Sequence, residues 1–132
     1  MIAVDTNVLV RFFIRDDERQ YQQAVKLLQS CEDSGDPIFI SNLTLVELVW
    51  VLKGAYKVIK EDMIKTVSLL LSNQQFRFAD PGLISDALAS YQSGRADFVD
   101  YMIGHDGLKK GVRTTFTFNK RCGKERTFSL LA

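Results

Sequence analysis

Short apolar runs and longer amphipathic stretches alternate along the chain, which predicts strands alternating with helices. Apolar runs without alternation, typical of strands covered on both faces, occur at 2–4 and 38–40. Three further short strands are expected at 76–79, 114–118 and 128–131. Apolar residues spaced three to four apart predict helices at 7–14, 18–31, 44–52, 61–74, 83–93 and from 97 to about 107. This alternation predicts an α/β fold with a mainly parallel central sheet.

The length of 132 residues fits one domain, and we expect a single domain over residues 1–132. A hydrophobic share of 46% and a charged share of 25% are typical of a compact soluble protein. Cys31 and Cys122 lie far apart and are expected to be free thiols in a reducing cytosol. We find no signal peptide and no uncharged run near ~20 residues, so we expect a cytoplasmic protein without a membrane segment.

Charge is unevenly distributed along the chain. Residues 1–100 hold 10 Lys/Arg and 14 Asp/Glu (net −4), whereas residues 101–132 hold 7 and 2 (net +5). The basic residues of this last segment are Lys109, Lys110, Arg113, Lys120, Arg121, Lys124 and Arg126. They could follow a phosphate backbone, because phosphate contacts need cations but no particular sequence. The alternative is an ordinary solvated surface.

Asp5 directly follows the first predicted strand, in an otherwise apolar run. Ligands of open parallel sheets bind outside the carboxyl ends of the strands, so this position predicts a functional acid. The alternative is that Asp5 caps a helix that begins near Thr6.

Glu47 is the single charged residue in the apolar run 43–52. A buried acid needs partners, and a metal ion is one of them. The alternative is a capping box, since Thr44 and Glu47 have the required spacing. Because the run is apolar on nearly every face, we also expect a second copy of the chain to cover it near Trp50, in a homodimer.

Asp97 and Asp100 are three positions apart at the start of a predicted helix, so their side chains lie close together. They could bind a metal, or Asp97 could cap the helix with Asp100 in its first turn. Asn119 follows the strand at 114–118 and would reach the same sheet edge as Asp5 if that strand is parallel. His105 has no apparent ligand partner and is expected to be a packing or surface residue.

The acids Asp5, Glu47 and Asp100 each lie at the edge of an apolar element, where a parallel sheet could gather them. Two carboxylates about 4 Å apart repel by roughly 4 kcal/mol at an effective dielectric near 20, so such a cluster takes up protons or binds a hard cation. Oxygen ligands without His or Cys favour Mg²⁺ or Mn²⁺ over zinc. Beside a phosphodiester, such an ion can activate water and neutralise developing charge, which predicts hydrolysis of nucleic acid.

Three motifs match a known family. They are Val4-Asp5-Thr6-Asn7-Val8-Leu9, Ser41-x-x-Thr44-x-x-Glu47-Leu48 and Asp97-Phe98-x-Asp100-Tyr101-x-Ile103. In their order and spacing, the chain resembles PIN-domain proteins over nearly its whole length, and most closely the VapC toxins of type II toxin–antitoxin pairs.

The resemblance implies a three-layer α/β/α sandwich, Mg²⁺- or Mn²⁺-dependent endoribonuclease activity on RNA, a homodimer, and inhibition by a small cognate antitoxin. It also implies that Asp5, Glu47 and Asp100 are the catalytic metal ligands and that Asp97 is an accessory acid. Thr6 would hold the water at the metal or orient Asp5.

One position departs from the pattern of many PIN domains, because Asn119 stands where a fourth acid is common. An amide can still accept from water or coordinate weakly, so the change puts a second metal in doubt while leaving the nuclease interpretation in place. One alternative is a non-catalytic PIN-like module that binds nucleic acid or protein. A phosphotransferase of the haloacid dehalogenase kind is disfavoured, because it needs an acid where Asn7 stands.

Overall fold

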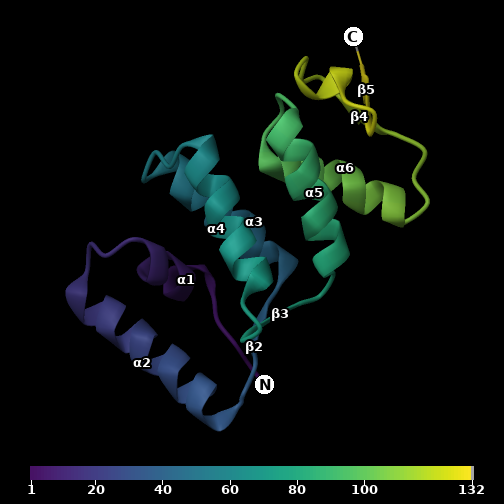
Figure 1. The fold of residues 1–132 in the computed structure, drawn as a ribbon. Helices are drawn as coiled ribbons and strands as arrows, with labels where there is room; N and C mark the ends of the chain where they lie inside the picture. The colour runs from purple at the N-terminus through teal and green to yellow at the C-terminus, as the bar shows by residue number, and fades with distance from the viewer. Residues whose placement is uncertain (132) are drawn as a thin grey trace. The chain divides into compact units, whose positions relative to one another are not determined.

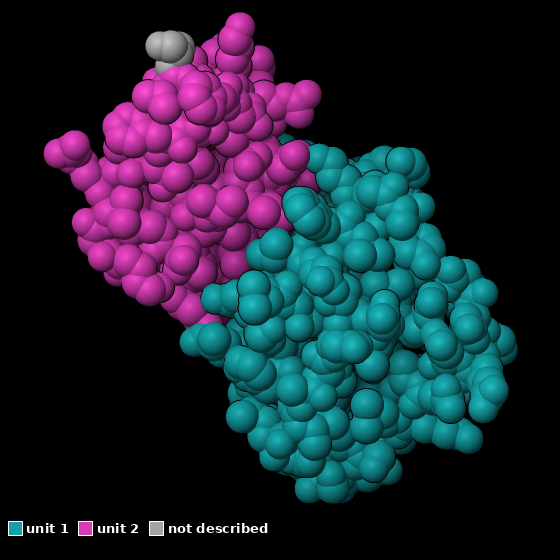
Figure 2. Space-filling view, turned by 180° about the vertical axis from the view of Figure 1, so that it is seen from behind, with its two compact units in different colours: residues 1–79 teal, residues 80–132 magenta. Residues whose placement is uncertain are grey.

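The computed structural model describes residues 1–131, in which strands alternate with helices (Figure 1). The chain divides into two compact units, which are described separately: unit 1 is Met1–Ala79, and unit 2 begins at Asp80 (Figure 2). The elements of unit 1 are β1 (Ile2–Ala3), α1 (Thr6–Phe13), α2 (Glu18–Ser34), β2 (Ile38–Ile40), α3 (Asn42–Gly54), α4 (Lys60–Ser72) and β3 (Phe76–Phe78). Those of unit 2 are α5 (Pro81–Ser93), α6 (Phe98–Lys109), β4 (Thr115–Thr117), the 3-10 turn η1 (Cys122–Lys124) and β5 (Phe128–Leu130).

Unit 1 contains a parallel sheet with the strand order β1-β2-β3, in which Ile38 pairs with Ile2 on one side and Phe76 on the other. The central strand β2 is buried as its apolar run predicts, since Ile38 and Ile40 are both fully enclosed. The expectation that the first strand is covered on both faces is wrong, because Ile2 is half-buried and Ala3 is exposed at the sheet edge.

Polar and glycine residues at the helix ends explain where the helices begin and stop. Asp17 caps α2 by accepting a hydrogen bond from the backbone N–H of Gln20 at 3.0 Å. The helix ends at Gly35, whose φ of 69° is left-handed, where glycine carries no steric penalty. Asp80 caps α5, with Pro81 in the first turn, where its missing N–H costs nothing.

Unit 2 is built on the pair α5 and α6, followed by the parallel strands β4 and β5. Its core holds the rings of Phe98 and Tyr91, which meet edge to face with centroids 5.9 Å apart. Helix α6 approaches Thr127, which directly precedes β5, so closely that a Cβ at Gly104 would lie 2.3 Å from Oγ1 of Thr127. Phe98 is the first residue of α6, so its burial against Tyr91 holds the end of the helix at which two candidate acids lie.

The predicted α/β class with parallel strands is confirmed in each unit. The expectation of one domain over residues 1–132 stays a prediction. Across residues 1–131, no helix is both long and apolar enough to cross a membrane. Cys31 and Cys122 are free, as expected, and both are buried.

Candidate functional site

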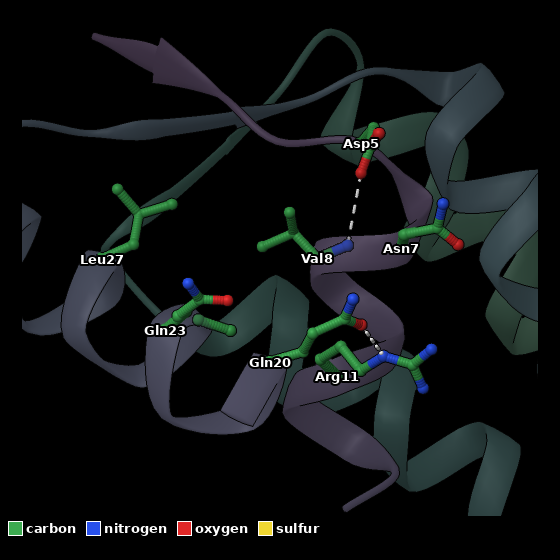
Figure 3. Close-up of a pocket in the computed structure, with 8 residues that line it drawn as sticks. Asp5, Asn7, Val8, Arg11, Gln20, Gln23 and Leu27 are labelled. Atoms are coloured by element: carbon green, nitrogen blue, oxygen red, sulfur yellow. Dashed lines mark hydrogen bonds between the residues drawn. The ribbon is translucent and has the colours of Figure 1, made fainter. Parts of the chain in front are cut away.

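Asp5 caps α1 and also faces a pocket (Figure 3). Its Oδ1 accepts a hydrogen bond from the backbone N–H of Val8 at 3.3 Å, so the capping alternative is confirmed. The side chain is nevertheless exposed and lines a pocket of about 370 Å³ between α1 and α2. Because the cap bond occupies one oxygen, the other oxygen remains able to bind a ligand.

The charge of Asp5 is not neutralised by the cation on the pocket wall. Nη1 of Arg11 lies 2.6 Å from Oδ1 of Asp16, and Nε of Arg11 donates to Gln20 Oε1 at 2.6 Å. Asp5 itself forms no ion pair within residues 1–131. The pocket therefore presents one carboxylate, that of Asp5, without a positive partner.

The next residue, Thr6, is buried in the first turn of α1 with 6% of its surface exposed.

Glu47 lies on an exposed face of α3, and not at the start of this helix. The helix begins at Asn42 because Ser41 caps it, with its Oγ accepting from the backbone N–H of Thr44 at 3.1 Å. The capping box of Thr44 with Glu47 is therefore wrong, and so is the expectation that Glu47 is buried. In the described part of the chain Glu47 has no Lys or Arg partner, which leaves its carboxylate available to a cation.

Asp97 and Asp100 are brought together at the start of α6 in a reciprocal capping box. The backbone N–H of Asp97 donates to Oδ2 of Asp100 at 3.0 Å, and both side chains are half-buried. The capping role expected as an alternative is thus confirmed for this pair. Each bond holds its carboxylate in one orientation without using all of its lone pairs.

The buried thiol of Cys122 lies beside Asp100. Burial raises the pKa of Cys122 to about 11, and the negative charge of Asp100 and its hydrogen bond with the thiol add to the shift. The thiol is therefore protonated at neutral pH.

A buried tyrosine joins the turn before α6 to the η1 segment. The hydroxyl of Tyr101 accepts from the backbone N–H of Ala96 at 3.3 Å and donates to Oε1 of Glu125 at 2.7 Å. Burial, together with this bond to Glu125, raises the pKa of Tyr101 to about 12. Gly94 leaves room for the hydroxyl, because a Cβ there would lie 1.7 Å from its oxygen.

Asn119 is exposed two residues after β4 and supports a local turn. Its side-chain oxygen accepts from the backbone N–H of Arg121 at 2.9 Å, and its own N–H donates to Oγ1 of Thr117 at 3.0 Å. Strand β4 pairs with β5 in unit 2, so the expectation that Asn119 shares an edge with Asp5 stays a prediction. His105 is a half-buried packing residue, as expected, with Nε2 2.8 Å from Oγ of Ser90.

Some basic residues of unit 2 form ion pairs with acids, and within residues 1–131 others form none. Nζ of Lys109 lies 3.0 Å from Asp80, and Nζ of Lys110 lies 2.8 Å from Asp106. A separate hollow of about 710 Å³ is lined by Ser93, Gly94, Arg95, Lys120, Arg121, Lys124 and Glu125. Arg95 lies outside the basic segment and was not among the predicted site residues, although its place two residues before Asp97 is a signal that the sequence contains.

The predicted acids fall into two pairs, one in each unit. Asp5 and Glu47 belong to unit 1, and Asp97 and Asp100 belong to unit 2. Within either unit of the described chain, no three Asp, Glu, His or Cys side chains form a ready metal site. That the pairs share one ion therefore stays a prediction. The available donors are carboxylate oxygens, and this donor set fits a hard divalent cation.

Comparison with known proteins shows matches over nearly the whole chain. A family model described as a PIN domain matches residues 2–121. The VapC ribonuclease of Aquifex aeolicus (strain VF5) is 24% identical over 124 residues, which cover 94% of this chain and 91% of that protein. These findings confirm the resemblance indicated by the three motifs and the fold class that it implies.

Proposed function

Because the chain belongs to the PIN-domain family, we propose that it is a metal-dependent endoribonuclease that hydrolyses RNA phosphodiester bonds, as the toxin of a toxin–antitoxin pair. The similarity to a VapC ribonuclease supports the choice of RNA as substrate. The observation that carries the proposal is the exposed, unneutralised carboxylate of Asp5, held in the pocket just beyond β1.

In this proposal Asp5, Glu47 and Asp100 hold Mg²⁺ or Mn²⁺, and Asp97 is an accessory acid. The bound ion would supply activation of the attacking water and neutralisation of the charge on the phosphate. The backbone N–H of Val8 orients Asp5, and the N–H of Asp97 orients Asp100. These bonds fix the carboxylates before the substrate arrives, as a catalytic site requires.

We further propose three properties that follow from the likeness to VapC. The protein acts in the cytoplasm, it forms a homodimer, and a small cognate antitoxin inhibits it. The exposed side chains of Leu43 and Trp50 on α3 support the dimer, because large apolar side chains on a surface favour an interface.

One observation favours the alternative of a non-catalytic PIN-like binding module. Asp5, Asp97 and Asp100 all take part in helix caps, which would account for these acids without any metal. A metal-dependent nuclease needs the negative charges of these acids, whereas a binding module in which they only cap helices does not. Asparagine caps a helix about as well as aspartate does but lacks the charge that holds a cation.

The test exchanges Asp5→Asn and Asp100→Asn, with Asp17→Asn as the matched control. Asp17 caps α2 through the same kind of bond as Asp5 but lies outside the candidate site. We expect both site variants to lose cleavage of RNA in Mg²⁺ or Mn²⁺ by more than the ~10–100-fold typical of residues that only support ligands. The control should cleave RNA like the unmodified protein, and all three variants should keep their melting temperatures within a few degrees.

Cleavage retained in both site variants would remove these acids from the mechanism. In cells, the unmodified chain should arrest growth, Asp5→Asn should not, and co-expression of the antitoxin should relieve the arrest. Harmless expression of the unmodified chain would contradict the toxin role and leave the nuclease role standing.

A further inference from the structure

The hollow in unit 2 gathers four cations that the fold leaves unneutralised. Arg95, Lys120, Arg121 and Lys124 are all exposed, and within residues 1–131 none of them forms an ion pair. Lys109 and Lys110, which belong to the same basic segment, each have an acidic partner. Arg113 and Arg126 are also exposed and form no ion pair in the described chain, but they do not line this hollow. The basic hollow, defined by the four lining cations, can therefore receive an anion without breaking an ion pair, and it gathers these cations in one place.

A buried tyrosine joins the two segments that line the basic hollow. The walls of the hollow come from segments 93–95 and 120–125, which are far apart in the sequence. Tyr101, which is 1% exposed, joins them by accepting from Ala96 and donating to Glu125. Glu125 is the one acid in the lining, and its carboxylate is already engaged by Tyr101. The two segments that carry the cations are thus joined to each other through Tyr101 before any ligand binds.

The lining also indicates which chemistry the basic hollow recognises. It contains no aromatic side chain on which a base could stack. Arginine and lysine bind phosphate oxygens without reading sequence. A volume of about 710 Å³ is large enough for more than a single phosphate group.

We propose that the basic hollow binds the phosphate backbone of single-stranded RNA, with Arg95 placing the strand beside the turn that carries Asp97 and Asp100. This inference rests on the proposed function and adds to it the surface that holds the substrate. The proposed RNA-binding residues therefore differ from the basic segment that the sequence predicts. Lys109 and Lys110 are left out because each is paired with an acid, and Arg95, which lies outside that segment, is added.

The test compares two double variants that lose the same charge. Lys120→Gln with Lys124→Gln changes the basic hollow, whereas Lys109→Gln with Lys110→Gln removes two lysines elsewhere in unit 2. Binding of an end-labelled single-stranded RNA is measured by filter binding in EDTA, so that no metal-dependent cleavage occurs, over a series of KCl concentrations. Each phosphate contact contributes about 0.7 to the slope of log affinity against log salt.

We expect the first double variant to bind at least about 10-fold more weakly and to lose about 1.4 from the salt slope, since two contacts are removed. Arg95→Gln alone should lose about 0.7. The second double variant should keep the slope of the unmodified protein. Equal weakening in both double variants would show a response to net charge only and would overturn the proposal, as would undiminished binding in the first.

A competitor separates RNA from an acidic protein segment. RNA should displace the labelled strand at a far lower concentration than polyglutamate of equal charge, and equal displacement would overturn the assignment to RNA.

The outcomes also separate this inference about RNA binding from the proposal that the protein is a nuclease. If the salt slope falls as expected in a protein that does not cleave RNA, RNA binding by the basic hollow is supported and the nuclease proposal is contradicted. If the first double variant cleaves RNA with an unchanged KM, only RNA binding by the basic hollow is contradicted.

Discussion

At the scale of single residues, the candidate acids can combine two roles, helix capping and metal binding, that their sequence pattern presents as alternatives. Asp5 and Asp100 each accept a backbone N–H and keep further lone pairs. A cap bond restricts the rotation of the carboxylate, so it prepares the side chain to bind a cation in a fixed direction. The helix cap is therefore compatible with metal binding, and the loss of the negative charge in the Asp5→Asn and Asp100→Asn variants is what distinguishes a ligand from a cap.

The buried hydroxyl of Tyr101 predicts how stability depends on alkaline pH. Folding raises its pKa from an ordinary 10.0 to about 12, so its contribution to stability is complete below pH 10 and is lost as the pH rises through 12. Tyr101→Phe should unfold more easily at neutral pH by about 1.5–3 kcal/mol, because a hydrogen bond to a charged group is removed. It should also lose less stability than the unmodified protein between pH 10 and 12.

Denaturant unfolding at a series of pH values measures both effects. Tyr21→Phe is the control, because its ring lies against Arg15 and its substitution leaves Tyr101 intact. Cys122, whose pKa is also raised, adds a loss of the same sign from pH 9 upward in every variant. An alkaline loss that is equally steep in Tyr101→Phe and Tyr21→Phe would contradict the role given to Tyr101.

At the scale of helices and strands, sequence patterns predicted most elements because the boundary signals are local. Capping residues and turn glycines such as Asp17 and Gly35 act within a few positions of the helix end that they set. The start of α3 was predicted two residues late, since Ser41, Asn42 and Thr44 are all good capping residues. Tertiary packing determines which of these residues becomes the cap, and the pattern of apolar positions along the sequence gives no information about that packing.

In the candidate site, too, contacts between residues close in the sequence could be predicted, whereas contacts between distant segments could not. Asp97 and Asp100 could be paired from the sequence because they are three positions apart. The bond of Tyr101 to Glu125 spans 24 positions, and no local pattern predicts it. Arg95 was missed for the same reason, because its cationic neighbours in the basic hollow come from a distant segment.

The position of the α3 boundary predicts the effect of changing its cap. Ser41→Ala should lower the free energy of unfolding by about 1 kcal/mol, because the N–H of Thr44 loses its acceptor. Ser41→Asn should restore most of this loss, and Ser68→Ala inside α4 should cost nothing, since alanine favours a helix interior. Thermal unfolding of the three variants measures the differences. A larger loss in Ser68→Ala than in Ser41→Ala would contradict this boundary.

At the scale of the whole molecule, one family model spans both compact units. The proposed ligands are also divided, with two acids encoded before residue 80 and two after it. The proposed activity therefore needs the entire chain, and neither unit carries the full set of acids.

The exposed face of α3 predicts the state of association. Leu43 and Trp50 are 83% and 70% exposed, and large apolar side chains on a surface favour burial against a second copy of the chain. Sedimentation at micromolar concentration should give a dimer, and Trp50→Ala should shift the population towards the monomer. A monomer of the unmodified chain under these conditions would contradict the homodimer.

Trp50 is the one tryptophan of the 132 residues, and its indole is largely open to water. The intrinsic fluorescence of the protein therefore reports on this single face of α3 without any added dye. A blue shift of the emission on raising the protein concentration would mean that a second copy covers the indole, and a blue shift only on adding antitoxin would mean that the inhibitor does.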